Sequence, residues 1–262
     1  MKKIETIIRK EWAEIFKNRL VLFTVAFLPL LLTAIPLIIL FSMRGPSVSA
    51  AGSELPEQFT ALCPADLNGA ECMQVYLVSQ FMLMFMILPL AIPGTIAAYS
   101  IVGEKTTRSL EPLLATPITT VELLVGKSLS AAIPGTLATY AGFLVFAAGA
   151  FIIVPNKSLL SALLDARWLI AIFLVGPLMA LLSVTVSIMV SSRVNDPRVA
   201  EQLSMVVILP VLGLFFGQIS GLFLVNRQLI IAIGIALVFI DAIMVYLAGR
   251  VFQREVILTR WK

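Results

Sequence analysis

Histidine is absent from this chain of 262 residues, and cysteine occurs only twice. Without histidine the chain lacks the most common general base and the most common transition-metal ligand. Charged residues are also scarce, at 13% of the sequence. Among the 15 acidic residues only Asp241 lies well inside an apolar run, so paired carboxylates for hydrolysis cannot be assembled there. We therefore expect no catalysis by this chain alone and no cofactor or metal ion bound to it.

Apolar sequence is what the chain has in abundance: 60% of its residues are hydrophobic, and its mean hydropathy is +1.02. A soluble domain of this size needs far more charge to cover its surface. An apolar run of ~20 residues forms a helix long enough to cross the ~30 Å core of a bilayer. Six runs reach that length, at residues 20–42, 76–102, 128–154, 168–190, 203–223 and 229–249. The sequence predicts an all-α membrane protein in which residues 1–262 form one transmembrane domain.

The placement of the basic residues predicts the orientation. Of the 19 Lys and Arg residues, 15 lie in four segments, 1–19, 103–127, 191–202 and 250–262, and the alternate loops hold four. Because cytoplasmic segments carry the excess of positive charge, we expect a multi-pass protein of the plasma (inner) membrane with both termini in the cytoplasm. These charges are spread over four segments and form no basic stripe, so we expect no nucleic-acid partner.

Residues 1–19 combine a regular apolar stripe with many basic side chains. The stripe has a spacing of three to four residues and consists of Ile4, Ile7, Ile8, Trp12, Ile15 and Phe16. This pattern is typical of an amphipathic helix that lies on the membrane surface among anionic lipid headgroups. The alternative is a basic flank that only sets the orientation of the first span.

Both cysteines fall in the longest loop that is predicted to lie outside, residues 43–75. Cys63 and Cys72 are nine positions apart. Two thiols in one loop facing an oxidising compartment favour a disulfide. The alternative is a pair of free thiols in an unstructured loop.

The cytoplasmic segment 103–127 mixes charges with exposed leucines. Residues 104–115 can form a short helix that carries Leu110, Leu113 and Leu114 on one side. Pro117 ends it because proline disfavours helical geometry in the residue before it. Thr119 and Glu122 then form a capping box that begins a new helix. The pattern predicts an elbow whose leucines need a cover, unless it folds back onto the lipid headgroups.

The tripeptide Gly126-Lys127-Ser128 looks like the end of a phosphate-binding loop. That motif requires a glycine five positions before the second one, and this chain has Val121 there. It also requires a preceding strand, whereas this tripeptide opens an apolar run. We therefore interpret Lys127 as a basic anchor at the inner end of the third span.

The elbow resembles the signature of one permease family. Residues 104–118 read EKTTRSLEPLLATPI and residues 122–127 read ELLVGK. ATP-binding-cassette (ABC) exporters of the second class typically have E-K-E-x-G-T-L-E-x-L-L-x-T-P-I followed by E-L-x-x-G-K. This chain departs at Thr106, Arg108 and Ser109. The resemblance implies the type V ABC exporter fold, with six transmembrane helices after an N-terminal interfacial helix.

The resemblance also implies partners. In such proteins the loop between the second and third spans is a coupling helix that docks onto a separate ATPase subunit, where ATP and Mg²⁺ are bound. Carried over to this chain, the ATPase-coupling residues are Glu104, Lys105, Leu110, Glu111, Leu113, Leu114, Thr116 and Pro117. A second permease copy or a homologue is expected to complete the translocation path. Exporters of many substrates share this pattern, so it does not indicate which one is moved.

Three features lie inside the apolar runs. Gly213, Gly217 and Gly221 repeat every four residues in the fifth run, which favours close helix packing within or between subunits. Prolines at positions 29, 36, 89, 93, 134, 177 and 210 leave backbone carbonyls without helical partners. Asp241 lies in the sixth run, where an ionised carboxylate costs ~3 kcal/mol.

Two interpretations of Asp241 stay open: an ion or substrate site, or a hydrogen bond to a neighbouring helix. The first would suit a self-contained secondary transporter or channel, although that class usually places several polar groups at the midplane. A membrane scaffold or membrane enzyme is a further alternative to the exporter.

Overall fold

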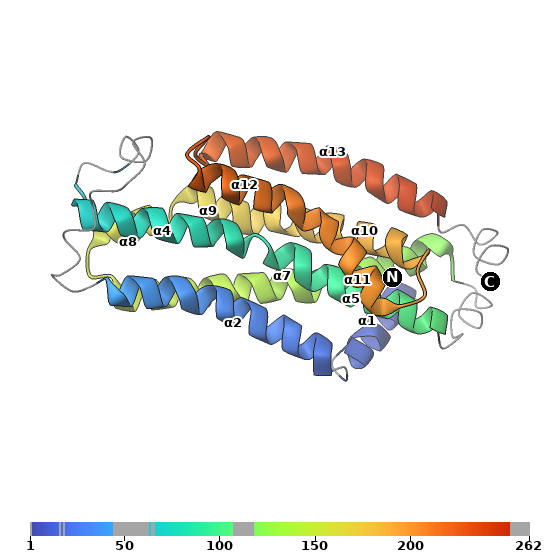
Figure 1. Cartoon of the computed structure of the whole chain (residues 1–262). Helices are drawn as coiled ribbons and strands as arrows, with labels where there is room; N and C mark the ends of the chain where they lie inside the picture. Colours follow the sequence, from blue (N-terminus) through green and yellow to red (C-terminus); the bar gives the residue numbers. More distant parts are fainter. Residues whose placement is uncertain are drawn as a thin grey trace.

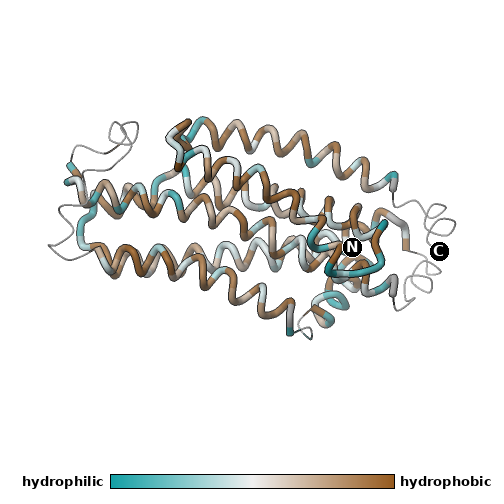
Figure 2. Tube along the Cα trace, in the orientation of Figure 1, coloured by the Kyte–Doolittle hydropathy of each residue, from teal (hydrophilic) through white to brown (hydrophobic). Residues whose placement is uncertain are grey.

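The computed structural model describes residues 2–15, 17, 19–43, 63, 66–106 and 118–251. Six helical segments of this part are long and apolar enough to cross a membrane, and they form an elongated bundle (Figure 1). Hydrophobic residues run along the bundle, and hydrophilic ones gather towards its ends (Figure 2). The predicted all-α membrane protein with six spans is therefore confirmed. The spans are Val21–Ser42, Gly69–Glu104, Val121–Ile153, Lys157–Ser191, Pro197–Ile219 and Arg227–Arg250.

Helix α1 (Lys2–Ile15) precedes the first span, α2 (Arg19–Ser42). It confirms the predicted amphipathic N-terminal helix, although it is shorter than residues 1–19. In Figure 1, α1 lies at the end of the bundle where the last helix, α13 (Arg227–Val251), also ends. We call this the α1 end.

The second span is made of two helices. Helix α4 (Gly69–Phe85) begins at a capping box formed by Asn68 and Glu71, and α5 (Leu88–Thr106) continues in nearly the same direction. The break falls between them because Pro89 has no N–H to donate to the carbonyl of Phe85. This span lies at the centre of the bundle, since 72% of the residues in its most apolar stretch are buried, against 22% for the first span.

The third span is one continuous helix, α7 (Thr120–Ile153). Thr119 and Glu122 form the capping box that the sequence predicts, with Thr119 accepting from the Glu122 N–H and Glu122 accepting from the Thr119 N–H. Helix α7 therefore begins before the predicted start of this span at residue 128. It packs against α1, α2, α5 and α10.

The fourth span contains a π-helical turn, η2 (Ala171–Val175), followed by α10 (Gly176–Ser191). Two short helices precede this turn, α8 (Lys157–Leu163) and α9 (Ala166–Ile170). Pro177 has no N–H to donate to the carbonyl of Phe173. The hydroxyl of Tyr140 on α7 donates to that carbonyl instead, at 3.2 Å.

The fifth span differs from its predicted bounds of 203–223, because it runs from Pro197 to Ile219. It consists of α11 (Pro197–Ser204), the short η3 (Met205–Ile208) and α12 (Leu209–Ile219). Asp196 caps α11 by accepting a hydrogen bond from the N–H of Arg198, and this polar cap extends the helix beyond the apolar run. The sixth span, α13, packs mainly against α10.

Candidate functional site

Helix α1 lies unusually close to the first turns of α7. A Cβ atom at Gly126 would stand 2.9 Å from Cγ2 and 3.0 Å from Cβ of Ile7, so glycine is needed for this approach. One turn earlier, Lys3 forms an ion pair with Glu122 at 3.6 Å. Helix α1 therefore packs lengthwise against the first turns of α7.

A tryptophan adds a hydrogen bond to this contact. The indole Nε1 of Trp12 donates to the carbonyl oxygen of Ser130 at 3.1 Å. Pro134 lies four residues further along α7 and has no N–H, so the Ser130 carbonyl has no helical donor. A proline in the third span thus supplies the acceptor that holds α1.

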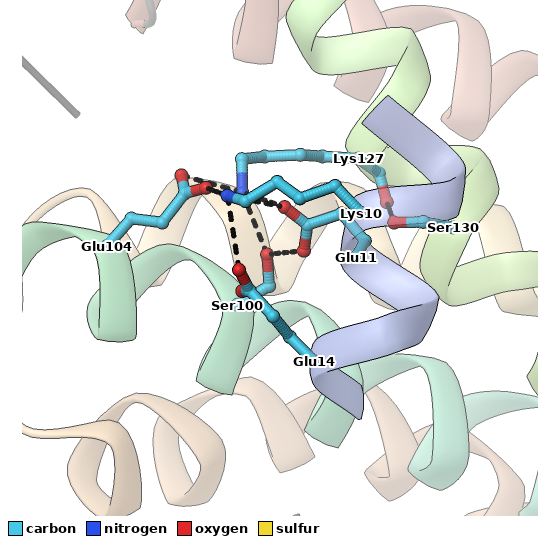
Figure 3. A network of polar contacts seen from close by, with 7 residues as sticks. All are labelled: Lys10, Glu11, Glu14, Ser100, Glu104, Lys127 and Ser130. Carbon is cyan, nitrogen blue, oxygen red and sulfur yellow. Dashed lines mark hydrogen bonds and ion pairs between the residues drawn. The ribbon is translucent and has the colours of Figure 1, made fainter. Parts of the chain in front are cut away.

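A buried charged cluster joins α1, α5 and α7 (Figure 3). The Lys127 ammonium is only 3% exposed and lies 2.9 Å from Glu11 and 2.8 Å from Glu104. It also donates to the Ser100 hydroxyl at 2.8 Å, and Ser100 donates to the second oxygen of Glu11. Removing one member of such a buried pair leaves an uncompensated charge, which costs ~3–5 kcal/mol.

Lys10 completes the cluster on its more exposed side. Its ammonium bonds to Glu104 and lies 3.7 Å from Glu11 and 3.6 Å from Glu14. Three carboxylates therefore face two ammonium groups. We call these residues the charged cluster: Lys10, Glu11, Glu14, Ser100, Glu104 and Lys127.

The cluster shifts the pKa values of Glu11 and Lys10, two of the groups on α1. Burial alone would raise the pKa of Glu11, but Lys127, the Ser100 hydroxyl and Lys10 outweigh it and hold that pKa below its ordinary value of 4.5. Burial likewise would lower the pKa of Lys10, but Glu104, Glu11 and Glu14 raise it above 10.5. Both groups are therefore charged throughout the neutral range.

A cavity of about 390 Å³ lies beside the charged cluster. Residues of α1 and α5 form most of its wall, together with Val21 of α2 and Pro197 of α11. Glu11, Glu14 and Glu104 line it, and each also contacts a lysine. In the part of the chain that the structure describes, no group of three or more Cys, Asp or Glu residues is arranged to hold a metal ion.

The cluster lies at the base of the predicted coupling segment. Glu104 lies in the last turn of α5, and Lys127 lies in the first turns of α7. The Glu104 carboxylate points inward to Lys10 and Lys127, so this predicted ATPase-coupling side chain is buried within the chain. Its contact with an ATPase stays a prediction.

The other predicted coupling residues are not placed by the structure. Lys105 belongs to α5, but its side chain is outside the described part. Outside the described residues altogether lie Leu110, Glu111, Leu113, Leu114, Thr116 and Pro117.

Lys127, interpreted from the sequence as a basic anchor at the inner end of the third span, has its ammonium buried between two carboxylates of the same chain. Which side of the membrane it lies on stays a prediction. Sequence reasoning missed Glu11 as its partner. A signal was present: Glu11 stands between Ile7 and Ile15 at four-residue spacing, so it lies on the apolar stripe itself. An acid on the buried face of a helix needs a basic partner.

The predicted disulfide between Cys63 and Cys72 is confirmed, with Cα atoms 6.0 Å apart. Cys72 lies in the first turn of α4 and is buried. The bond therefore ties the chain before α4 to the start of that helix, at the end of the bundle opposite α1.

The sequence predicts close helix packing at the three glycines, within or between subunits, and among the described residues no such face is found within the subunit. Gly221 lies beyond the end of α12, in a turn with φ of +71° that suits glycine. A Cβ at Gly213 would meet nothing within 4 Å, and the three atoms nearest to one at Gly217 belong to the ring of Phe223. Within the described residues these glycines do not bring two spans together, and a contact with a second subunit stays a prediction.

Asp241 lies on the packed face of α13. The buried residues of this helix, Ile230, Gly234, Leu237, Asp241 and Ala248, recur at helical spacing, and α10 is its main neighbour. Both Asp241 carboxylate oxygens are buried and have no hydrogen-bond partner among the described residues. The hydrogen bond to a neighbouring helix is therefore not found there, and an ion or substrate role stays a prediction.

The comparison with known families agrees with the six-span architecture. A family profile described as ABC-2 family transporter protein matches residues 5–231, which include most of α1, the charged cluster and five of the six spans. No curated protein matches the chain. Because the profile covers most of the sequence, the chain belongs to the ABC-2 family of transporter proteins and is a membrane-embedded permease of an ABC transporter.

Proposed function

We propose that this permease exports its substrate by using ATP that a separate ATPase subunit hydrolyses. ATP and Mg²⁺ bind to that subunit, and residues 107–117 dock onto it. The observation that carries the proposal is the position of the charged cluster. Glu104 and Lys127, on either side of this segment, meet at 2.8 Å, so the segment leaves and re-enters the bundle at one fixed point.

The α1 end faces the cytoplasm in this proposal. Four segments that hold 15 of the 19 basic residues belong to the same side of the predicted topology. Both termini then lie in the cytoplasm, where ATP is available, and Cys63 and Cys72 lie on the opposite, oxidising side.

The leucines of the 107–117 segment supply the docking surface. Burying one leucine fully is worth ~1.5–3 kcal/mol, so three of them give a hydrophobic centre to an interface. Lys105 and Glu111 stand at its polar rim. A second permease copy or a homologue completes the path, and lipids surround the exposed apolar faces of α2, α7, α12 and α13.

The test is co-purification of the tagged permease with the ATPase encoded by the neighbouring gene. Leu113→Asp/Leu114→Asp should release the ATPase while the six spans stay inserted, because both substitutions fall between the second and third of the spans found among the described residues. Thr107→Asp/Ser109→Asp is the matched control, since it adds the same charge but keeps the leucines. If the leucine variant still holds the ATPase at the wild-type level, these residues are not the docking site.

Pro117 tests the angle between the docking helix and α7. Pro117→Ala should keep the ATPase bound but uncouple ATP hydrolysis from export, because the leucines are intact and only the turn is altered. The readouts are co-purification and transport in the same preparation. If no ATPase ever co-purifies with the wild-type chain, a secondary transporter that uses the buried Asp241 takes the place of the exporter.

A further inference from the structure

We propose that α1, the end of α5 and the start of α7 move as one rigid unit during transport, and that Glu11, Glu104 and Lys127 are the positioning residues that join them. The inference rests on the proposed function, because the unit is the base from which the 107–117 segment reaches the ATPase. It assigns to α1 a mechanical role in addition to the place among lipid headgroups that the sequence predicts.

Lys127 is the central residue of this unit. Its single ammonium contacts carboxylates from two different helices, Glu11 of α1 and Glu104 of α5, at 2.9 and 2.8 Å. All three side chains are at most 5% exposed, so water screens these attractions little. A movement of α5 relative to α7 would separate buried opposite charges, and the three helices therefore resist it together.

Three further contacts fix α1 to α7 along its length. Lys3 pairs with Glu122 near the start of α1, Ile7 covers Gly126, and Trp12 donates to the Ser130 carbonyl. The contacts advance in the same direction along both helices, which makes the pair parallel. Contacts spread over several turns oppose sliding and rotation of α1, which a single ion pair would not.

A covalent cross-link tests the rigid unit directly. At positions 7 and 126 the two Cβ atoms would be 3.0 Å apart, slightly closer than the ~3.5–4.5 Å of disulfides. Ile7→Cys/Gly126→Cys should therefore cross-link on oxidation with only a small retreat of α1. Mass spectrometry of a non-reduced digest separates this bond from Cys63–Cys72, and the two single-cysteine variants are the controls.

If the three helices move together, the cross-link should leave the ATP hydrolysis of the permease–ATPase complex unchanged. If α1 slides on α7 during the cycle, the cross-link should stop ATP turnover. That second outcome would overturn the proposal. The single-cysteine variants, oxidised in the same way, show whether either substitution alone affects turnover.

A charge-balanced double variant separates positioning from folding. Glu11→Gln/Lys127→Met removes one carboxylate and one ammonium, and it leaves Glu104 with Lys10. We expect this variant to fold and to retain the ATPase. The permease-dependent stimulation of ATP hydrolysis should nevertheless fall about tenfold, within the range of coupling between distant sites. Glu5→Gln, an exposed acid-to-amide change on the same helix, is the matched control.

Rescue makes the positioning role falsifiable. Adding the 7–126 cross-link to the Glu11→Gln/Lys127→Met variant should restore stimulation on oxidation, because a covalent bond replaces the ion pair. A double variant that stimulates ATP hydrolysis at the wild-type level, or one that the cross-link fails to rescue, would overturn the inference. Failure of the wild-type chain to bind any ATPase would instead contradict the proposed function, and the cross-linking yields would still report whether α1 is fixed to α7.

Discussion

The charged cluster and Asp241 are two ways in which this permease buries charge, and they have opposite local chemistry. In the cluster, Glu11 and Glu104 each lie within 3 Å of the Lys127 ammonium. On α13, the buried carboxylate of Asp241 has no hydrogen-bond partner among the described residues. Paired charges tie helices together, whereas an unpartnered one weakens the packing around it.

The difference indicates where the molecule is fixed and where it can change. The cluster joins three helices at the α1 end, below the segment that is proposed to bind the ATPase. Asp241 lies on the buried face of α13, the helix whose main neighbour is α10. A buried polar group that destabilises its own surroundings is expected at a functional position, because selection for stability alone would replace it.

The largest effect is expected from Lys127→Met. The change leaves the carboxylates of Glu11 and Glu104 buried with only Lys10 to balance them, so unfolding should become easier by ~3–5 kcal/mol. Thermal unfolding of the detergent-solubilised protein measures it. Adding Glu11→Gln should recover most of the loss, because the number of buried charges is again balanced. If Lys127→Met alone were as stable as the wild type, the cluster would contribute nothing to folding.

Asp241→Leu should change the stability of the protein in the opposite direction to Lys127→Met. Removing an unpartnered buried carboxyl group should raise stability by ~1–3 kcal/mol in the same unfolding experiment. If Asp241 serves an ion or substrate, transport should fall while stability rises, and Asp241→Asn keeps the shape as a control. A loss of stability similar to that of Lys127→Met would instead mean that Asp241 has a partner in the folded protein.

The sequence predicted the spans better than it predicted the site. Apolar runs of membrane length give six helices, and the capping box at Thr119 and Glu122 gives the start of α7, because both depend on neighbouring residues alone. The ion pair of Glu11 with Lys127 joins residues 116 positions apart, so periodicity along either helix cannot show it. The start of α11 was missed because its first turns are polar and are capped by Asp196.

Acid should weaken the cluster before it affects the spans. The folded-state pKa of Glu11 lies below its ordinary 4.5, so its stabilisation is complete above that pH and is lost as the pH falls through the lower folded value. The pKa of Lys10 is raised above 10.5, so its contribution is present below that pH and is lost as the pH rises through the raised value.

Trp12 reports this change, because its indole is bonded to Ser130 only while α1 is docked. We expect a change in Trp12 fluorescence in acid and none across the neutral range. Trp12→Phe should abolish the signal, and Glu11→Gln should remove its acid transition. An acid transition that persists in Glu11→Gln would assign the titration to another group.

The smallest effect is expected away from all buried charge, at Tyr140. Its hydroxyl donates to the Phe173 carbonyl, whose i+4 donor Pro177 removes, as Trp12 donates to the Ser130 carbonyl, whose i+4 donor Pro134 removes. Tyr140→Phe removes only this neutral hydrogen bond and keeps the ring beside Phe173, so the loss should be ~0.5–1.5 kcal/mol. Thermal unfolding of Tyr140→Phe and of Lys127→Met under the same conditions ranks the two losses of stability. A loss as large as that of Lys127→Met would mean that the π-helical turn of the fourth span depends on Tyr140 for its conformation. It would also mean that the charged cluster is not the main polar link between helices in the described part of the chain.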